Sequence, residues 1–189
     1  NWDESSVMCC LAALINYFGT PVSYNFLMGV SGQAFRIQLD QNGYCGSAPH
    51  ANCGFDCTQI IADSLGFVRT KYIFDKSDSP EFEIAKNAAI ASIKNGVPVL
   101  HQSWECDLVT GFNASNSLFY GRTWQNTKSN YQPIKKLNMG LEIFTKSRDA
   151  KPRGVLFKES LQRCVMLSKT ESFGNYCSGA KALENWIHW

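Results

Sequence analysis

The stretch that decides the fold is ESSVMCCLAALINYFGTPVSYNFLMGVSGQAF, residues 4–35. Apolar residues recur in its first half at the spacing of a buried helix, at Val7, Leu11, Leu14, Ile15 and Phe18. Ser5 and Ser6 stand where hydroxyls cap the first exposed amides, and Gly19 is placed to end the helix. The pattern predicts this helix, a turn, a second short helix over 22–30 and a glycine turn.

The start of the first helix is a candidate catalytic position. A helix N-terminus carries unpaired N–H groups and partial positive charge, which favour an ionised thiol and stabilise an oxyanion. Ser6, Cys9 and Cys10 are therefore candidate nucleophiles, with the backbone amides of residues 6–8 as an oxyanion hole. The alternative is that the serines only cap and the cysteines only pack, since free cysteine is among the most buried residue types.

Length and composition indicate an ordinary globular chain. Its 189 residues are 44% apolar and 18% charged, enough to bury a sizeable core. We expect one domain over 1–150 and a C-terminal helical extension over 151–189. A net charge of +2 with scattered Lys and Arg gives no footprint for nucleic acid, and no apolar run approaches a membrane span. We expect a cytoplasmic protein without a cofactor and leave its oligomeric state open.

The eight cysteines divide into core candidates and one loop. We expect free thiols where burial on an apolar face explains the residue, at Cys9, Cys10, Cys106 and Cys164. The loop GYCGSAPHANCGFDC contains Cys45, His50, Cys53 and Cys57, a ligand set that suits tetrahedral zinc. It lacks the paired C-x-x-C knuckles of a structural zinc site, so the alternative is a loop that covers a cleft. We expect no metal here.

Beyond this stretch the chain changes from helical to strand periodicity. Helices are predicted over 58–65, 80–95, 157–165 and 178–189. Strands are predicted over 34–39, 67–74, 98–102, 107–112, 117–120 and 141–145, with a hairpin turn at 113–116. A helical half followed by an antiparallel sheet and C-terminal helices gives an α+β fold.

Several motifs carry a family resemblance. The run CCLAALINYFG resembles the nucleophile helix of bacterial papain-like domains, namely the bacteriocin leader peptidases and the N-terminal domain of the butirosin biosynthesis protein H group. Similar segments follow in YNFLMGVSGQAF, GFDCTQIIADSLGF, CDLVTGFNASNSLFYG and SGAKALENWIHW. The resemblance implies a papain-like fold, with peptide hydrolysis or transfer of an acyl group to an amine as the family's chemistry.

The register of this resemblance leaves both catalytic positions without their usual residues. It puts the nucleophile at Ser6, with Cys10 as a second, packing cysteine, and it puts the catalytic histidine at about Glu105. His50 and His101 remain as candidate bases. Three side chains around the predicted hairpin are candidates for ligand binding, because aromatics beside carboxylates suit such a site: Trp104, Asp107 and Trp124.

Two classes of function follow from these residues. The first is a degenerate papain-like domain that binds a small molecule or peptide in the inherited cleft without turning it over. The second is an enzyme that uses Cys9, Cys10 or Ser6 for acyl transfer, either as a peptidase or as an amide-forming acyltransferase.

Overall fold

The computed structural model describes residues 5–42, 50–75, 79–103, 105–115, 117–123 and 130–188. The chain forms two compact units: unit 1 is Asn1–Pro21 with Val68–Lys146, and unit 2 is Val22–Phe67 with Ser147–Trp189. The chain therefore passes between the units three times. The predicted boundary at residue 150 lies close to the last of these crossings, and the other two have no counterpart in the predicted division.

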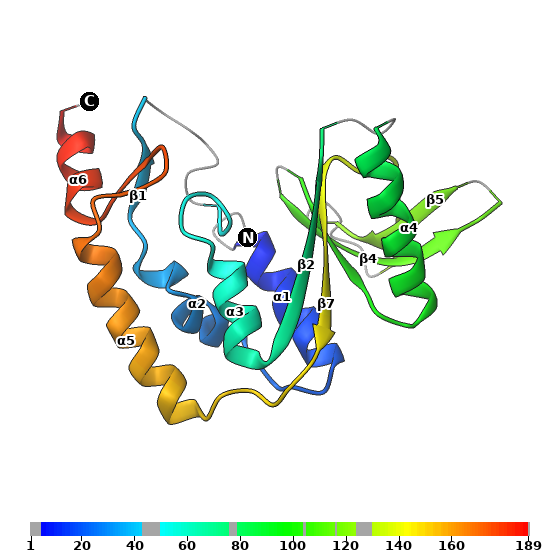
Figure 1. Cartoon of the computed structure of the whole chain (residues 1–189), viewed down its shortest axis with the longest axis horizontal. Helices are drawn as coiled ribbons and strands as arrows, with labels where there is room; N and C mark the ends of the chain where they lie inside the picture. Colours follow the sequence, from blue (N-terminus) through cyan, green and yellow to red (C-terminus); the bar gives the residue numbers. More distant parts are fainter. Residues whose placement is uncertain are drawn as a thin grey trace. The chain divides into compact units, whose positions relative to one another are not determined.

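The described residues of unit 1 form two helices and a six-stranded sheet with the strand order β2-β7-β3-β4-β5-β6 (Figure 1). Its elements are α1 (Ser6–Tyr17), β2 (Phe67–Phe74), α4 (Pro80–Lys94), β3 (Val99–Gln102), β4 (Cys106–Asn113), β5 (Leu118–Arg122), β6 (Gln132–Ile134) and β7 (Met139–Lys146). The pairs β3–β4, β3–β7, β4–β5 and β5–β6 are antiparallel. The predicted α+β fold class is confirmed.

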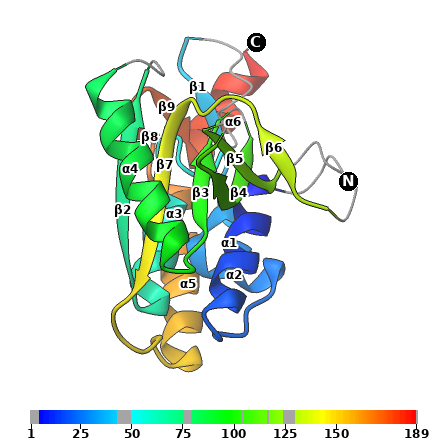
Figure 2. The same cartoon turned by 90° about the vertical axis from the view of Figure 1, so that its right-hand side faces the viewer.

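The two helices of unit 1 cover opposite faces of the sheet. Figure 2 shows α4 along one face, where its Ala85 and Ala89 join Val99 and Val109 in the core. Successive strand residues point to opposite faces, so Cys106, three positions before Val109, faces away from α4. The thiol of Cys106 lies beside Cys10 of α1, which places α1 on that second face. The start of α1 lies against β4, where Ser6 Oγ accepts the Cys106 N–H.

A buried ion pair joins β2 to β7 within this sheet. Arg69 donates two parallel hydrogen bonds to the Glu142 carboxylate, at 2.8 Å from Nε and 2.5 Å from Nη2. The side chains are 3% and 0% exposed. Burying two charges is costly, so this pair depends on the bidentate geometry that compensates both of them.

In unit 2, the part of the chain that the structure describes forms four helices, a 3-10 turn and a small sheet with the strand order β1-β9-β8. Its elements are α2 (Tyr24–Ser31), η1 (Gln33–Phe35), β1 (Gln38–Asp40), α3 (Cys57–Leu65), α5 (Arg153–Lys169), β8 (Ser172–Phe173), β9 (Tyr176–Ser178) and α6 (Gly179–Ile187). Helix α2 packs against α3 and α5. Among the described residues, no helix is both long and apolar enough to cross a bilayer.

Local signals explain most of these boundaries, with two corrections. Helix α2 begins where the Ser23 side chain accepts from Phe26 N–H, and α3 ends at Gly66 with a φ of 78°. The predicted cap of α1 is wrong, because the Ser5 side chain makes no capping hydrogen bond. The predicted strand over 34–39 is also largely wrong, since η1 occupies its first part and β1 starts only at Gln38.

Candidate functional site

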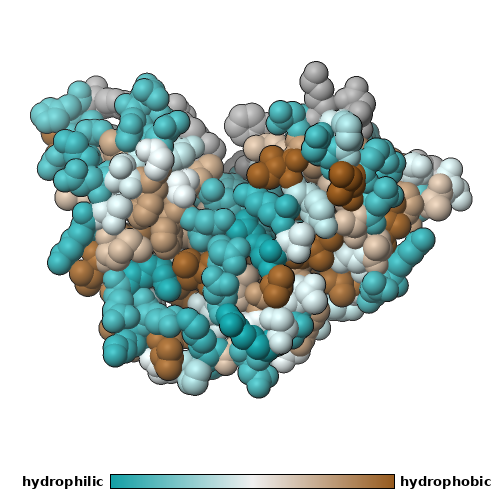
Figure 3. All heavy atoms as spheres, in the orientation of Figure 1, coloured by the Kyte–Doolittle hydropathy of each residue, from teal (hydrophilic) through white to brown (hydrophobic). Residues whose placement is uncertain are grey.

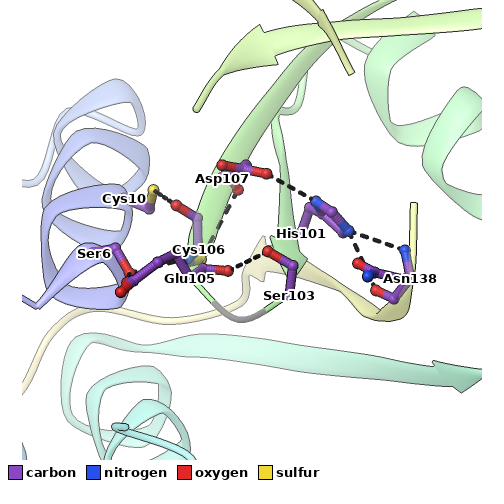
Figure 4. Close-up of polar contacts among 8 residues, drawn as sticks. All are labelled: Ser6, Cys10, His101, Ser103, Glu105, Cys106, Asp107 and Asn138. Carbon is purple, nitrogen blue, oxygen red and sulfur yellow. Dashed lines mark hydrogen bonds and ion pairs between the residues drawn. The ribbon is translucent and has the colours of Figure 1, made fainter. Parts of the chain in front are cut away.

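The candidate site lies in unit 1, where the start of α1 meets the turn between β3 and β4 (Figure 4). The Ser6 hydroxyl donates a hydrogen bond to the Glu105 carboxylate. The same Ser6 Oγ accepts the backbone N–H of Cys106 at 2.9 Å. Both side chains are half-buried. The structure therefore brings together the two residues that stand at the nucleophile and histidine positions of the resemblance.

The β3–β4 turn holds Glu105 in this place. Ser103 binds the carbonyl oxygen of Glu105 twice, through its backbone N–H at 2.9 Å and its hydroxyl at 2.7 Å. These bonds close a tight connection after Gln102, which pairs with Cys106 at the end of the ladder. Within the described residues, the Glu105 carboxylate forms no ion pair and bonds only to Ser6. It lies beside the first turn of α1, where Ser6 is located.

The cysteines nearest this site lie on α1 and at the start of β4. Cys10 lies one turn after Ser6, and its Sγ donates to the carbonyl oxygen of Cys106 at 3.4 Å. The Cys106 side chain is 1% exposed, and burial raises the pKa of its thiol well above the ordinary value, with Cys10 adding to the effect. A thiol held neutral is a poor nucleophile. Cys9 is half-buried and points about 100° around α1 from Cys10.

His101 is engaged at both ring nitrogens. Its Nδ1 lies 3.0 Å from Asp107 Oδ2, across the register pair of β3 and β4. Its Nε2 lies 3.2 Å from both the backbone N and the backbone O of Asn138. A ring that donates from Nδ1 and accepts at Nε2 satisfies Asp107 and the Asn138 N–H together. The ring is 2% exposed, so His101 and Asp107 are held against each other inside the sheet of unit 1.

The loop with His50 is organised by Arg36, which the sequence analysis did not identify. All of these residues belong to unit 2. The Arg36 guanidinium donates to the carbonyl oxygens of His50, Cys53 and Phe55, at 2.6, 2.9 and 3.2 Å. His50 Nδ1 accepts the Asn52 N–H at 3.3 Å. Because Arg36 binds main-chain carbonyls, it can fix this loop whatever side chains the loop carries, so the loop shows no sequence motif for the interaction.

The described part of this loop gives no metal site. Cys57 is buried at the start of α3, where its Sγ donates to Gln33 Oε1 at 3.2 Å. Burial raises the pKa of this thiol to about 11. Among the described residues, no group of three or more His, Cys, Asp and Glu side chains is arranged to hold a metal ion. Cys45, together with the ligand candidates Trp104 and Trp124, lies outside the described residues.

Disulfides are absent from the described part of the chain. The seven cysteines that the structure describes, Cys9 and Cys164 among them, form no such bond. Their redox state in solution stays a prediction.

The site positions a hydroxyl and a carboxylate, with a thiol one helical turn away, and it leaves His101 engaged elsewhere. These groups define the chemistry that the site can offer, and comparison with known proteins adds no assignment. No family model matches the chain, and no curated protein matches it.

Proposed function

We propose that this chain is a papain-like domain that binds a small molecule or a peptide beside Ser6 and Glu105 without turning it over. The observation that carries the proposal is the hydrogen bond from Ser6 to Glu105. It brings together the two positions that the resemblance assigns to a thiol and an imidazole, and it does so with residues of much weaker chemistry.

The weakness follows from acid–base properties. In a thiolate–imidazolium pair the base has an ordinary pKa near 6.5 and the thiol is acidic enough to ionise. A carboxylate, with an ordinary pKa near 4.3, is a base about a hundredfold weaker, and a serine hydroxyl is much harder to deprotonate than a thiol. A positioned general base contributes about two to four orders of magnitude in rate. Replacing both members of the pair therefore removes the unit that activates attack.

Neighbouring groups do not restore that unit. Cys10 is bonded to the Cys106 carbonyl, and the His101 ring is occupied by Asp107 and Asn138. Binding needs much less than catalysis. The Glu105 carboxylate can accept hydrogen bonds from a ligand, and the half-buried Ser6 hydroxyl can donate or accept them. A peptide or a small polar molecule presents both kinds of partner.

The test is an assay of the purified chain against a panel of peptides and acyl-thioesters, with binding to the same panel followed by thermal shift. We expect no turnover, and saturable binding that Glu105→Gln weakens. Glu83→Gln on α4 is the matched control, since Glu83 is exposed and pairs only with Lys86 in the described structure. It should bind as the native chain does.

The opposite outcome would favour acyl transfer. Robust turnover that is abolished by Cys9→Ala or Cys10→Ala, and also by His50→Ala or His101→Ala, would refute the binding proposal. It would identify a thiol and an imidazole as a working pair and would make the chain a peptidase or an amide-forming acyltransferase.

A further inference from the structure

Helix α5 of unit 2 presents an apolar ridge on the side that unit 2 does not cover. The ridge consists of Phe157, Leu161 and Val165, which are 67%, 51% and 52% exposed. These residues are spaced by four and therefore follow one line along the helix, with a length of about 12 Å. Figure 3 shows hydrophobic residues at the surface over α5.

The opposite side of α5 packs against the rest of unit 2. Leu156 and Leu167 are buried there, and Ser160 donates to the Gly29 carbonyl of α2 at 2.8 Å. Arg163 donates to the carbonyl of Val30, the next residue of α2. The exposed ridge is thus not needed to hold α5 in unit 2, and leaving three large apolar side chains in water is unfavourable.

The charges around the ridge specify its partner. Every exposed ionisable side chain of α5 is cationic, namely Arg153, Lys158 and Lys169. The acidic residue of the helix, Glu159, is only half-exposed and is paired with Lys151 at 2.7 Å. We infer that this ridge docks an amphipathic helix whose apolar stripe is flanked by acidic residues, with carboxylates facing these three cations.

Two other occupants fit these observations less well. A second copy of the chain that docked through the same ridge would bring the cations of one α5 against those of the other, which is repulsive. An anionic membrane surface is generally recognised by clusters of four to eight Lys or Arg residues, and α5 exposes fewer. An i, i+4, i+8 ridge is also the form that packs into the groove of another helix.

The inference is independent of the Ser6–Glu105 site, so its test uses other probes. The first probe is a fluorescent helical peptide of roughly 20 residues, long enough to hold a helix, with leucines along one stripe and glutamates beside it. The second has lysines in place of the glutamates, and the third is a scrambled form of the first. Fluorescence anisotropy measures the affinity of the complete chain for each.

We expect saturable binding of the glutamate peptide alone. Leu161→Asp should weaken it at least about tenfold, and Lys158→Glu should weaken it while improving binding of the lysine peptide. Both positions are exposed, and circular dichroism checks that the variants remain folded. Ile84→Asp, the same kind of change at a 61% exposed position on α4, should leave the affinity unchanged.

Other outcomes overturn the inference. Equal binding of the scrambled peptide, or no binding of the glutamate peptide, removes the docking site. Light scattering that shows a dimer abolished by Leu161→Asp assigns the ridge to a second copy. Sedimentation with phosphatidylserine vesicles that depends on Leu161, without peptide binding, assigns it to a membrane.

Discussion

Ser6 and Glu105 are 99 residues apart in the sequence and directly hydrogen-bonded in unit 1. The Ser6 hydroxyl is a donor to Glu105 and an acceptor for the Cys106 N–H. One small side chain thereby connects the first turn of α1 to the start of β4. The connection uses the donor of the hydroxyl and one of its two acceptor lone pairs.

Ser6→Ala should lower the free energy of unfolding by about 1–3 kcal/mol. The substitution leaves the Cys106 N–H without its acceptor and removes the donor to Glu105, and an unsatisfied group in a half-buried place costs roughly this much. Urea unfolding followed by circular dichroism measures the change. Ser115→Ala, at an exposed serine of the β4–β5 turn, is the control and should have almost no effect. Equal stability of the two variants would contradict a structural role for the Ser6 hydroxyl.

Removing one member of the Arg69–Glu142 pair should be much more costly. Arg69→Met removes the cation that compensates the Glu142 carboxylate, whose side chain is 0% exposed. Leaving a buried charge uncompensated destabilises a protein by about 3–5 kcal/mol. Replacing both members, in R69M/E142M, should recover much of the loss because no charge is left unpaired. Urea midpoints of the two single variants and the double variant test this. A double variant less stable than either single variant would show that the charges stabilise the sheet beyond compensating each other.

Periodicity made most of the fold predictable. The spacing of apolar residues indicates which face of an element is buried, and this spacing is clear for α1, α4 and the strands of unit 1. The hairpin β8–β9 was missed although Gly174-Asn175 between the two strands is a two-residue turn signal. Its strands have two and three residues, too few for an alternation of apolar and polar residues to be recognised.

The candidate site was predictable only in part. The register of the resemblance singled out Ser6 and Glu105, and the structure shows them in contact. The pairing of His101 with Asp107 depends on the exact length of the β3–β4 turn, which periodicity does not set. The role of Arg36 depends on main-chain carbonyls, and these leave no pattern in residue types.

Cys57 and Cys106 should resist alkylation in the native chain. Burial raises the pKa of Cys57 to about 11 and that of Cys106 well above its ordinary value, so almost no thiolate exists near neutral pH. Iodoacetamide treatment at pH 7.5 followed by peptide mapping should find both unmodified, and both should react in urea. Fast native modification of Cys57 would mean that the start of α3 opens readily.

The raised pKa of Cys57 also makes stability depend on pH. The folded thiol stays neutral up to about pH 11, whereas the unfolded thiol ionises above about 9. Its contribution is therefore complete below pH 9 and is lost as the pH rises to 11, a loss of about 3 kcal/mol. Cys57→Ser keeps a donor to Gln33 but does not titrate in this range. Its urea stability should fall less steeply between pH 9 and 10.5 than that of the native chain, and parallel curves would contradict the assignment.

Placing a thiol at position 6 and an imidazole at position 105 gives the most direct test of how the site is built. In S6C/E105H the new thiol and the new imidazole would stand where a hydroxyl and a carboxylate now bond. An imidazolium within hydrogen-bond reach lowers the pKa of a thiol, as does the N-terminus of α1. We expect iodoacetamide at pH 7 to modify the new thiol at least about tenfold faster than in S6C/E105Q, because one pKa unit changes the thiolate fraction tenfold.

The control S6C/E105Q has the same thiol on the same helix but no ionisable side chain at position 105. The difference in rate between the two variants therefore measures the effect of the imidazole on the thiol. The rate in S6C/E105H should also level off at a lower pH than in the control, because the imidazolium lowers the pH at which the thiolate forms, whereas the rate in the control should keep rising up to the ordinary pKa of a thiol. Equal rates and parallel pH profiles would mean that the two side chains do not meet in solution. The binding proposal would then lose its support, because it rests on the contact between Ser6 and Glu105.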